Sequence, residues 1–172
     1  YPNPEMFETF EKPDFTEYSG NLVVWGAGRI GGVAEHCLKQ RGVEISAFCD
    51  IAEDKWGTDF CGHPVISPQE LKGHFPNAAV VVSTVFHSTI CEELKKMNYE
   101  NVFDCTSLFM KIDFTGYKFW MEPDYAIRNV EQYLAAIYEQ VLKQNTIDQL
   151  FLNITTKCSL RCRDCSMFIA YV

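Results

Sequence analysis

The stretch Asn21–Gly32, NLVVWGAGRIGG, decides the fold of this chain. Its first five residues favour a buried strand, and a G-x-G-x-x-G pattern follows at once. Between a strand and a helix, Gly26 permits a tight turn, Gly28 lets a phosphate approach the backbone, and Gly31 lets the helix pack closely on the strand. The stretch therefore predicts the first strand–helix unit of a doubly wound α/β fold.

A helix and a second strand are expected after the glycines. Val33–Gln40 has apolar residues at helical spacing, and Val43–Cys49 has the composition of a strand that ends at Asp50. An acidic residue about twenty positions after the motif is the usual partner of a ribose in dinucleotide sites. This context predicts a Rossmann-like unit. The alternative is that the glycines only make the turn and Asp50 only caps a loop.

The candidate cofactor-binding residues surround the start of this first helix. The N–H groups of a first helical turn have no partner within the helix, so they can hold an anionic group such as a phosphate. We expect a nucleotide or a sugar nucleotide there. The candidate residues are Gly26, Gly28, Arg29, Ile30, Gly31 and Asp50.

The alternation of strands and helices continues along the chain. Ser67-Pro68-Gln69-Glu70 has the marks of a helix start, with a Ser cap, Pro at the first position and Glu three residues after the Ser. The near-continuous apolar run Ala78–Val82 is typical of a parallel strand covered on both faces, and Ser83 and Thr84 follow at its carboxyl end. The remaining expected elements are an excursion over Thr58–Ile66, a helix over Ser88–Met97 and a strand over Asn101–Cys105. Four or five parallel strands then form a small Rossmann-like domain over residues 21–118.

Three segments of this domain resemble those of a known group of proteins. VVWGAGRIGG, FCDIAEDKWG and CGHPVISPQEL are similar to segments of small Rossmann-like domains in sugar-modifying and polysaccharide-biosynthesis enzymes. Such domains resemble the nucleotide-sugar-binding half of certain acyltransferases and recur as appendages on methyltransferases. The resemblance implies a fold more firmly than a ligand, because similar folds carry unlike functions.

The domain is flanked by two helical segments. Residues 1–20 form an N-terminal arm with one short amphipathic helix, and residues 119–147 form a linker and a connecting helix that runs from Pro123 to about Gln144. An apolar stripe at helical spacing predicts packing, and we expect this long helix to dock the domain against the barrel described below. The stripe comprises Ala126, Ile127, Val130, Tyr133, Leu134, Ile137 and Val141.

Three closely spaced cysteines follow a second strand-forming run that begins at Leu150. Cys158, Cys162 and Cys165 have the spacing C-x3-C-x2-C, and flanking Lys and Arg side chains favour their thiolates. Thiolates are the usual ligands of iron–sulfur clusters. A structural zinc site needs a fourth ligand, and no further Cys or His lies close by. A disulfide framework is expected in small secreted chains, and purely structural cysteines would not need charged residues between them.

The segment Cys158-Ser-Leu-Arg-Cys162-Arg-Asp-Cys165 after a strand resembles the cluster motif of the radical S-adenosylmethionine (radical SAM) superfamily. The resemblance covers about the last 25 residues and implies a [4Fe-4S] cluster on the three cysteines. S-adenosylmethionine would bind at the fourth iron. Asp164 departs from the family, which often has an aromatic residue there to hold the adenine. Residues 148–172 would then be the start of a truncated (β/α) barrel, so we expect no catalytic residue and no radical chemistry in this fragment alone. The substrate, a small molecule or a peptide, stays open.

Composition limits the other classes. The chain has 172 residues, 47% of them hydrophobic, with a formal net charge of −8, which disfavours a nucleic-acid partner. No apolar run is long enough to span a membrane. Five further cysteines are scattered singly, as expected of small buried hydrophobes in a cytoplasmic protein. A nucleotide-binding module without catalysis of its own, or a dimerisation module that forms a homodimer, is the alternative to an enzyme.

Overall fold

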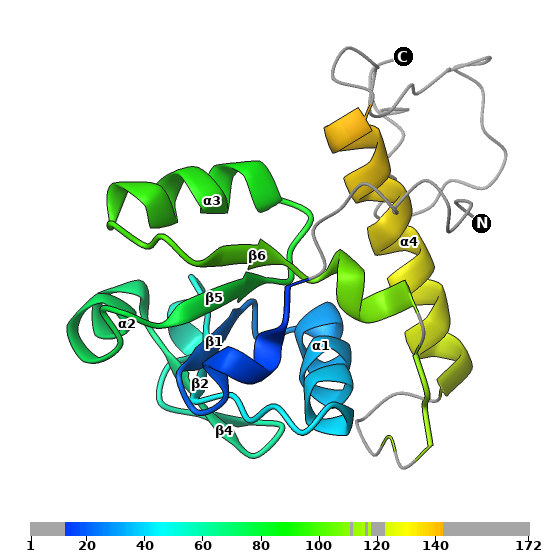
Figure 1. The fold of residues 1–172 in the computed structure, drawn as a ribbon, viewed down its shortest axis with the longest axis horizontal. Coiled ribbons are helices and arrows are strands. Elements are labelled where there is room, and N and C mark those ends of the chain that lie inside the picture. Colours follow the sequence, from blue (N-terminus) through cyan, green and yellow to red (C-terminus); the bar gives the residue numbers. More distant parts are fainter. Residues whose placement is uncertain (1–12, 111, 116, 118–122, 143–172) are drawn as a thin grey trace, which may run out of the picture.

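A six-stranded sheet with helices on both faces forms the body of the molecule (Figure 1). This description rests on a computed structural model, which describes residues 13–110, 112–115, 117 and 123–142. The strands are β1 (Leu22–Trp25), β2 (Ala47–Cys49), β3 (Asp59–Phe60), β4 (His63–Ile66), β5 (Ala79–Val82) and β6 (Val102–Asp104). The helices are α1 (Arg29–Gln40), α2 (Pro68–His74), α3 (His87–Lys96) and α4 (Pro123–Leu142).

The strands follow the order β3-β4-β2-β1-β5-β6. Five of them are parallel, and the two-residue β3 runs antiparallel to β4 at one edge. The central strand β1 has neighbours on both sides, because Val23 lies opposite Ala47 of β2 and opposite Val80 of β5. The order reverses at β1, since the chain builds first toward β4 and then toward β6. The predicted α/β class and the small doubly wound, Rossmann-like parallel sheet are confirmed.

Both faces of the sheet are covered, which explains the all-apolar strands. Leu22 and Val24 of β1 belong to a core shared with α1 and α4. Val23 and Trp25 belong to a second core shared with α2 and α3. Successive side chains of a strand point to opposite faces, so a strand buried on both faces cannot alternate apolar with polar residues.

The predicted start of α2 is confirmed in detail. The Ser67 hydroxyl accepts a hydrogen bond from the Glu70 N–H at 3.1 Å, and the Glu70 carboxylate accepts one from the Ser67 N–H at 2.8 Å. Two N–H groups that the helix itself leaves without partners are thereby satisfied. The helix start is therefore fixed by its own side chains.

Two predicted boundaries differ from the structure by several residues, and others by one. The first helix begins at Arg29 rather than at Val33, because Gly31 and Gly32 are helical despite their low intrinsic propensity. The second strand covers only Ala47–Cys49. Before it, the chain is held by the Ser46 N–H, which donates to the Leu22 carbonyl.

The predicted long helix is confirmed as α4, which lies beside α1 (Figure 1). Ala126, Val130 and Ile137 are buried, whereas Ile127, which was predicted on the same stripe, is 37% exposed. In the N-terminal arm, Phe15 is buried and its ring meets the Phe103 ring edge-on. The amphipathic helix expected near the start of the chain and the strand expected at Leu150 lie outside the described residues. Within the described part, no helix is long and apolar enough to cross a membrane.

Candidate ligand-binding site

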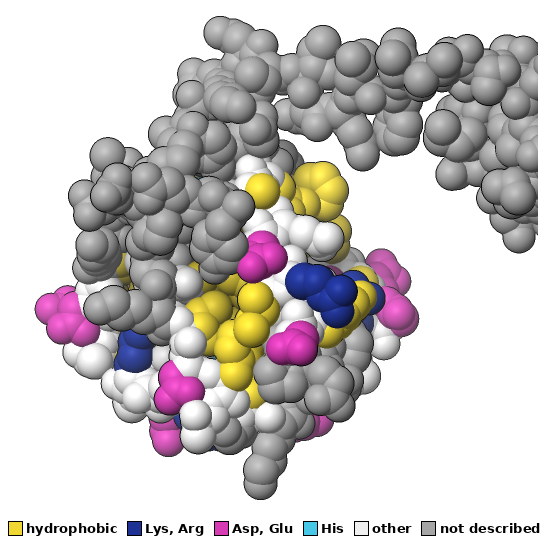
Figure 2. All heavy atoms as spheres, turned by 90° about the vertical axis from the view of Figure 1, so that its right-hand side faces the viewer, with side chains coloured by type: hydrophobic (Ala, Val, Ile, Leu, Met, Phe, Trp, Pro, Cys, Tyr) yellow, Lys and Arg dark blue, Asp and Glu magenta, His cyan; other side chains and the backbone are white. Residues whose placement is uncertain are grey.

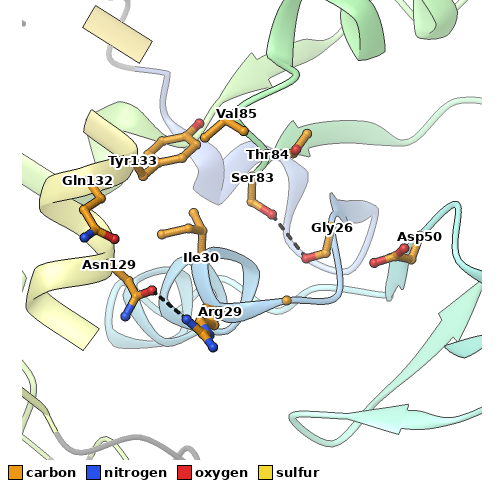
Figure 3. Close-up of a pocket in the computed structure, with 11 residues that line it drawn as sticks. Gly26, Arg29, Ile30, Asp50, Ser83, Thr84, Val85, Asn129, Gln132 and Tyr133 are labelled. Carbon is orange, nitrogen blue, oxygen red and sulfur yellow. Dashed lines mark hydrogen bonds between the residues drawn. The ribbon is translucent and has the colours of Figure 1, made fainter. Parts of the chain in front are cut away.

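A pocket opens where the strand order reverses, at the carboxyl ends of β1, β2 and β5. Ligands of open α/β sheets bind at this position, because the connections on the two sides diverge and leave a crevice. Its volume is about 430 Å³, within the range of small-molecule sites. Figure 3 shows it between α1, the end of β5 and α4. The lining residues are Gly26, Gly28, Arg29, Ile30, Asp50, Ser83, Thr84, Val85, Asn129, Gln132 and Tyr133.

Two of the motif glycines are required by the fold itself. Gly26 has a φ of +114°, and a Cβ there would lie 2.7 Å from the Ser83 hydroxyl. A Cβ at Gly31 would clash with the Gly26 carbonyl oxygen. The Ser83 hydroxyl donates to the carbonyl of Trp25 at 2.8 Å and ties the turn to β5. These contacts account for the first and the last glycine without any ligand.

Gly28 differs from the other two. Its backbone is extended, and a Cβ there would meet nothing within 4 Å. The fold therefore does not need a glycine at this position, yet the residue lines the pocket. The missing side chain keeps space open, as the close approach of a ligand to the backbone requires.

Gly28 is also the N-cap of α1, and no side chain caps this helix. The N–H groups of the first turn and the helix dipole make an uncapped start favourable for a negative charge. This contrasts with α2, whose start is capped by Ser67. Gly26, Gly28, Arg29 and Ile30, predicted from the sequence, are thus brought together at the pocket, and Gly31 packs directly behind them.

Arg29 lies at the rim of the pocket and is held by α4. Its Nη1 donates to the Tyr125 hydroxyl at 2.8 Å and to the Asn129 side-chain oxygen at 3.4 Å. The Arg29 and Arg128 guanidinium groups both lie near the Tyr125 ring, 5.2 and 5.8 Å from its centroid. Figure 2 shows basic side chains gathered beside hydrophobic ones on this side of the molecule. Arg29 therefore places a guanidinium group at the rim, and α4 side chains help to hold it there.

Asp50 lies at the β2 end of the pocket, and its carboxylate already accepts hydrogen bonds from the chain. Oδ2 accepts from the Ala27 N–H at 2.9 Å and from Lys55 Nζ at 2.8 Å. Oδ1 accepts from the Ala52 N–H at 2.9 Å. Lys55 also donates to the Ala27 carbonyl at 3.0 Å. Asp50, which the sequence predicted as a ribose partner, therefore also fixes the conformation of the glycine turn.

The contribution of α4 is the part of the pocket that sequence reasoning missed. Asn129, Gln132 and Tyr133 line it, whereas the sequence pointed to Tyr133 only as part of a packing stripe. A periodic stripe indicates which side of a helix is buried, but it does not show that one buried residue also borders a cavity. No local motif marks these residues.

The predicted iron ligands Cys158, Cys162 and Cys165 lie outside the described residues. Within the described part of the chain, no three His, Cys, Asp or Glu side chains cluster closely enough to hold a metal ion. The five other cysteines are free thiols, and Cys37, Cys49 and Cys105 are buried as predicted. Cys61 and Cys91 are only partly buried. Burial raises the pKa of Cys37 and of Cys61 to about 12, so these thiols stay protonated at neutral pH.

Part of the chain is similar to known proteins. Residues 18–102 match the family described as C2185-like, N-terminal. No curated protein matches the chain. Among solved structures, the chain is similar to UDP-D-quinovosamine 4-dehydrogenase from Vibrio fischeri. The identity is 27%, the match covers 48% of this chain and 75% of that one, and the TM-score is 0.41.

Proposed function

We propose that the pocket binds a phosphate-bearing ligand of the nucleotide or sugar-nucleotide class. The observation that carries the proposal is the open space at Gly28, in front of the uncapped start of α1 and inside a cavity at the reversal of strand order. A phosphate there would meet helix N–H donors rather than a side chain. Gly-rich turns before a helix serve this purpose because they combine close approach with unpaired donors.

The charges around the pocket support an anionic ligand. Lys55 pairs with Asp50 at 2.8 Å and offsets the carboxylate that lines the pocket. Arg29 adds a cationic group at the rim, next to the start of α1. Arginine binds phosphate well because its planar fork matches the oxygen geometry. The phosphates would therefore lie at the start of α1, and the uncharged part of the ligand would extend over Ile30 toward α4.

The described lining residues suit binding better than catalysis. They include no His and no Cys. The carboxylate among them, Asp50, already accepts hydrogen bonds from Lys55 and from backbone N–H groups. A nucleophile or general base would need a partner that activates it within hydrogen-bond reach. We therefore assign recognition, rather than a reaction, to this domain.

Isothermal titration of the protein with NADH and with UDP-N-acetylglucosamine tests the proposal. We expect saturable binding of at least one of them in the wild type. Gly28→Ala should weaken that binding at least tenfold, because the new methyl group enters the open space. Gly73→Ala in α2 is the matched control, since a Cβ there also meets nothing within 4 Å but lies outside the pocket. If none of these ligands binds, or if both variants bind like the wild type, the proposal is wrong.

We propose a second function for the cysteine triplet, supported by its spacing and by the family resemblance of its motif. Cys158, Cys162 and Cys165 would supply three thiolates to a four-iron cluster with one open iron, and the resemblance implies that S-adenosylmethionine binds at that iron. The intact native protein, reconstituted under anaerobic conditions, should then carry about four irons and broad visible absorption. If Cys158→Ala retains the same bound iron, or if the native protein carries zinc, this second proposal fails.

A further inference from the structure

Helix α4 completes the pocket from outside the matched family segment. The family match ends at residue 102, whereas α4 begins at Pro123. Three α4 residues nevertheless line the cavity, and Figure 3 shows Asn129, Gln132 and Tyr133 along the side that faces α1 and β5. Whatever binds at the glycine turn therefore also meets α4.

Tyr133 is the lining residue of α4 with the most constrained position. Its side chain is 2% exposed, and its ring packs edge-on against Phe109 with centroids 5.8 Å apart. In Figure 3 the ring extends from α4 above Ile30, with the hydroxyl on the side of Val85. The ring is thus fixed by packing, which leaves the hydroxyl little freedom to seek another partner.

The Tyr133 hydroxyl is poorly satisfied within the described residues. The hydroxyl oxygen is itself buried and makes no hydrogen bond that meets ordinary geometry, and its polar neighbour is the Cys105 thiol, a weak partner. Buried hydroxyls without a good partner are rare because they lose their bonds to water. The Thr106 and Ser107 hydroxyls are also unsatisfied in the described part of the chain, but they do not line the pocket.

We propose that the Tyr133 hydroxyl donates a hydrogen bond to an uncharged acceptor oxygen of the ligand, which makes α4 the specificity-determining wall of the pocket. The inference rests on the proposed binding of a phosphate-bearing nucleotide. Burial raises the pKa of Tyr133 well above its usual value, so the group is a neutral donor at physiological pH. Because the phosphates occupy the start of α1, the acceptor left for the α4 side of the pocket is a nucleobase carbonyl or a sugar hydroxyl.

Tyr133→Phe separates this role from packing. The variant removes only the poorly satisfied hydroxyl, so its melting temperature should equal or exceed that of the wild type. Its dissociation constant for UDP-N-acetylglucosamine should rise about tenfold, the effect expected for one lost hydrogen bond. Titration with UDP alone locates the acceptor. An equal loss for both ligands indicates the nucleobase, and a loss for the sugar nucleotide only indicates the sugar.

Tyr99→Phe is the matched control, because it removes a buried tyrosine hydroxyl that has partners and lies outside the pocket. The Tyr99 hydroxyl is also buried, but it donates at 2.9 Å to the Leu71 and Phe75 carbonyls on the far face of the sheet. This variant should lose stability and keep its affinity. If Tyr133→Phe binds like the wild type, the inference is overturned and the proposed function stands. If the wild type binds NADH but neither UDP nor the sugar nucleotide, the inference is overturned and the proposed function stands. If it binds none of these ligands, both are overturned.

Discussion

The two faces of the sheet differ in how their polar groups are satisfied. On the face of α2 and α3, several polar groups have partners within the chain: Ser67 and Glu70 form the capping box of α2, and Tyr99 donates to two carbonyls, although the start of α3 has no side-chain cap. On the face of α1 and α4, the helix start is uncapped and the Tyr133 hydroxyl lacks a good partner. Under the proposed function, the first face contributes stability and the second keeps its donors for a ligand.

Gly31→Ala should have the largest effect on this contrast. The new methyl group would clash with the Gly26 carbonyl oxygen, and backbone cannot move aside as a flexible side chain can. We expect a loss of more than about 3 kcal/mol in the free energy of unfolding, beyond the usual range for overpacking. Urea denaturation measures it. A loss no larger than that of Gly28→Ala would mean that the two glycines are not distinguished by the fold.

Asp50→Asn should rank second. The amide can accept fewer of the hydrogen bonds now made by the Ala27 and Ala52 N–H groups, and the pairing with Lys55 loses its charge. We expect a loss of about 1–2 kcal/mol, mainly from the buried backbone contacts, because Lys55 is 39% exposed and screened by water. Lys55→Met keeps the hydrogen bonds from the Ala27 and Ala52 N–H groups to Asp50 and should cost less. Equal losses for the two variants would mean that the ion pair, rather than the backbone hydrogen bonds, supplies most of the stabilisation.

Ser67→Ala, on the face of α2 and α3, should have a smaller effect on stability. It removes the acceptor of the Glu70 N–H and should cost about 1 kcal/mol, as is usual for an N-cap. Thermal unfolding measures the change, with ligand affinity as the control. A change in affinity would show that the two faces are coupled, contrary to the division described above.

The smallest expected effect is a pH dependence at Glu70. Hydrogen bonds from Ser67 lower the pKa of this carboxyl from its ordinary value near 4.5. Its contribution to stability is therefore present above that value and is lost as the pH falls through the lower, folded-state pKa. Glu70→Gln should flatten the stability profile on the acid side and leave neutral pH little changed. An unchanged acid limb would contradict this assignment.

The sequence predicted the fold well where glycines and apolar runs carry local information. Gly26 and Gly31 predicted a turn in which a larger side chain would clash, and Ser67 predicted the start of α2. It was less accurate at Val33, where glycine propensity hid the first turn of α1. It also missed the pocket contribution of Tyr133, because only three-dimensional packing joins α4 to a turn about 100 residues earlier. The expected division into domains, the cytoplasmic location and the homodimer stay predictions.

The sheet also ends in short strands on both sides. In the described part of the chain, the outermost strands are the two-residue β3, which runs antiparallel to its neighbour, and the three-residue β6. An unpaired strand edge can template pairing with another molecule, and brevity limits how many hydrogen bonds such pairing can make. At high concentration the domain should therefore resist growing into fibrils through its sheet.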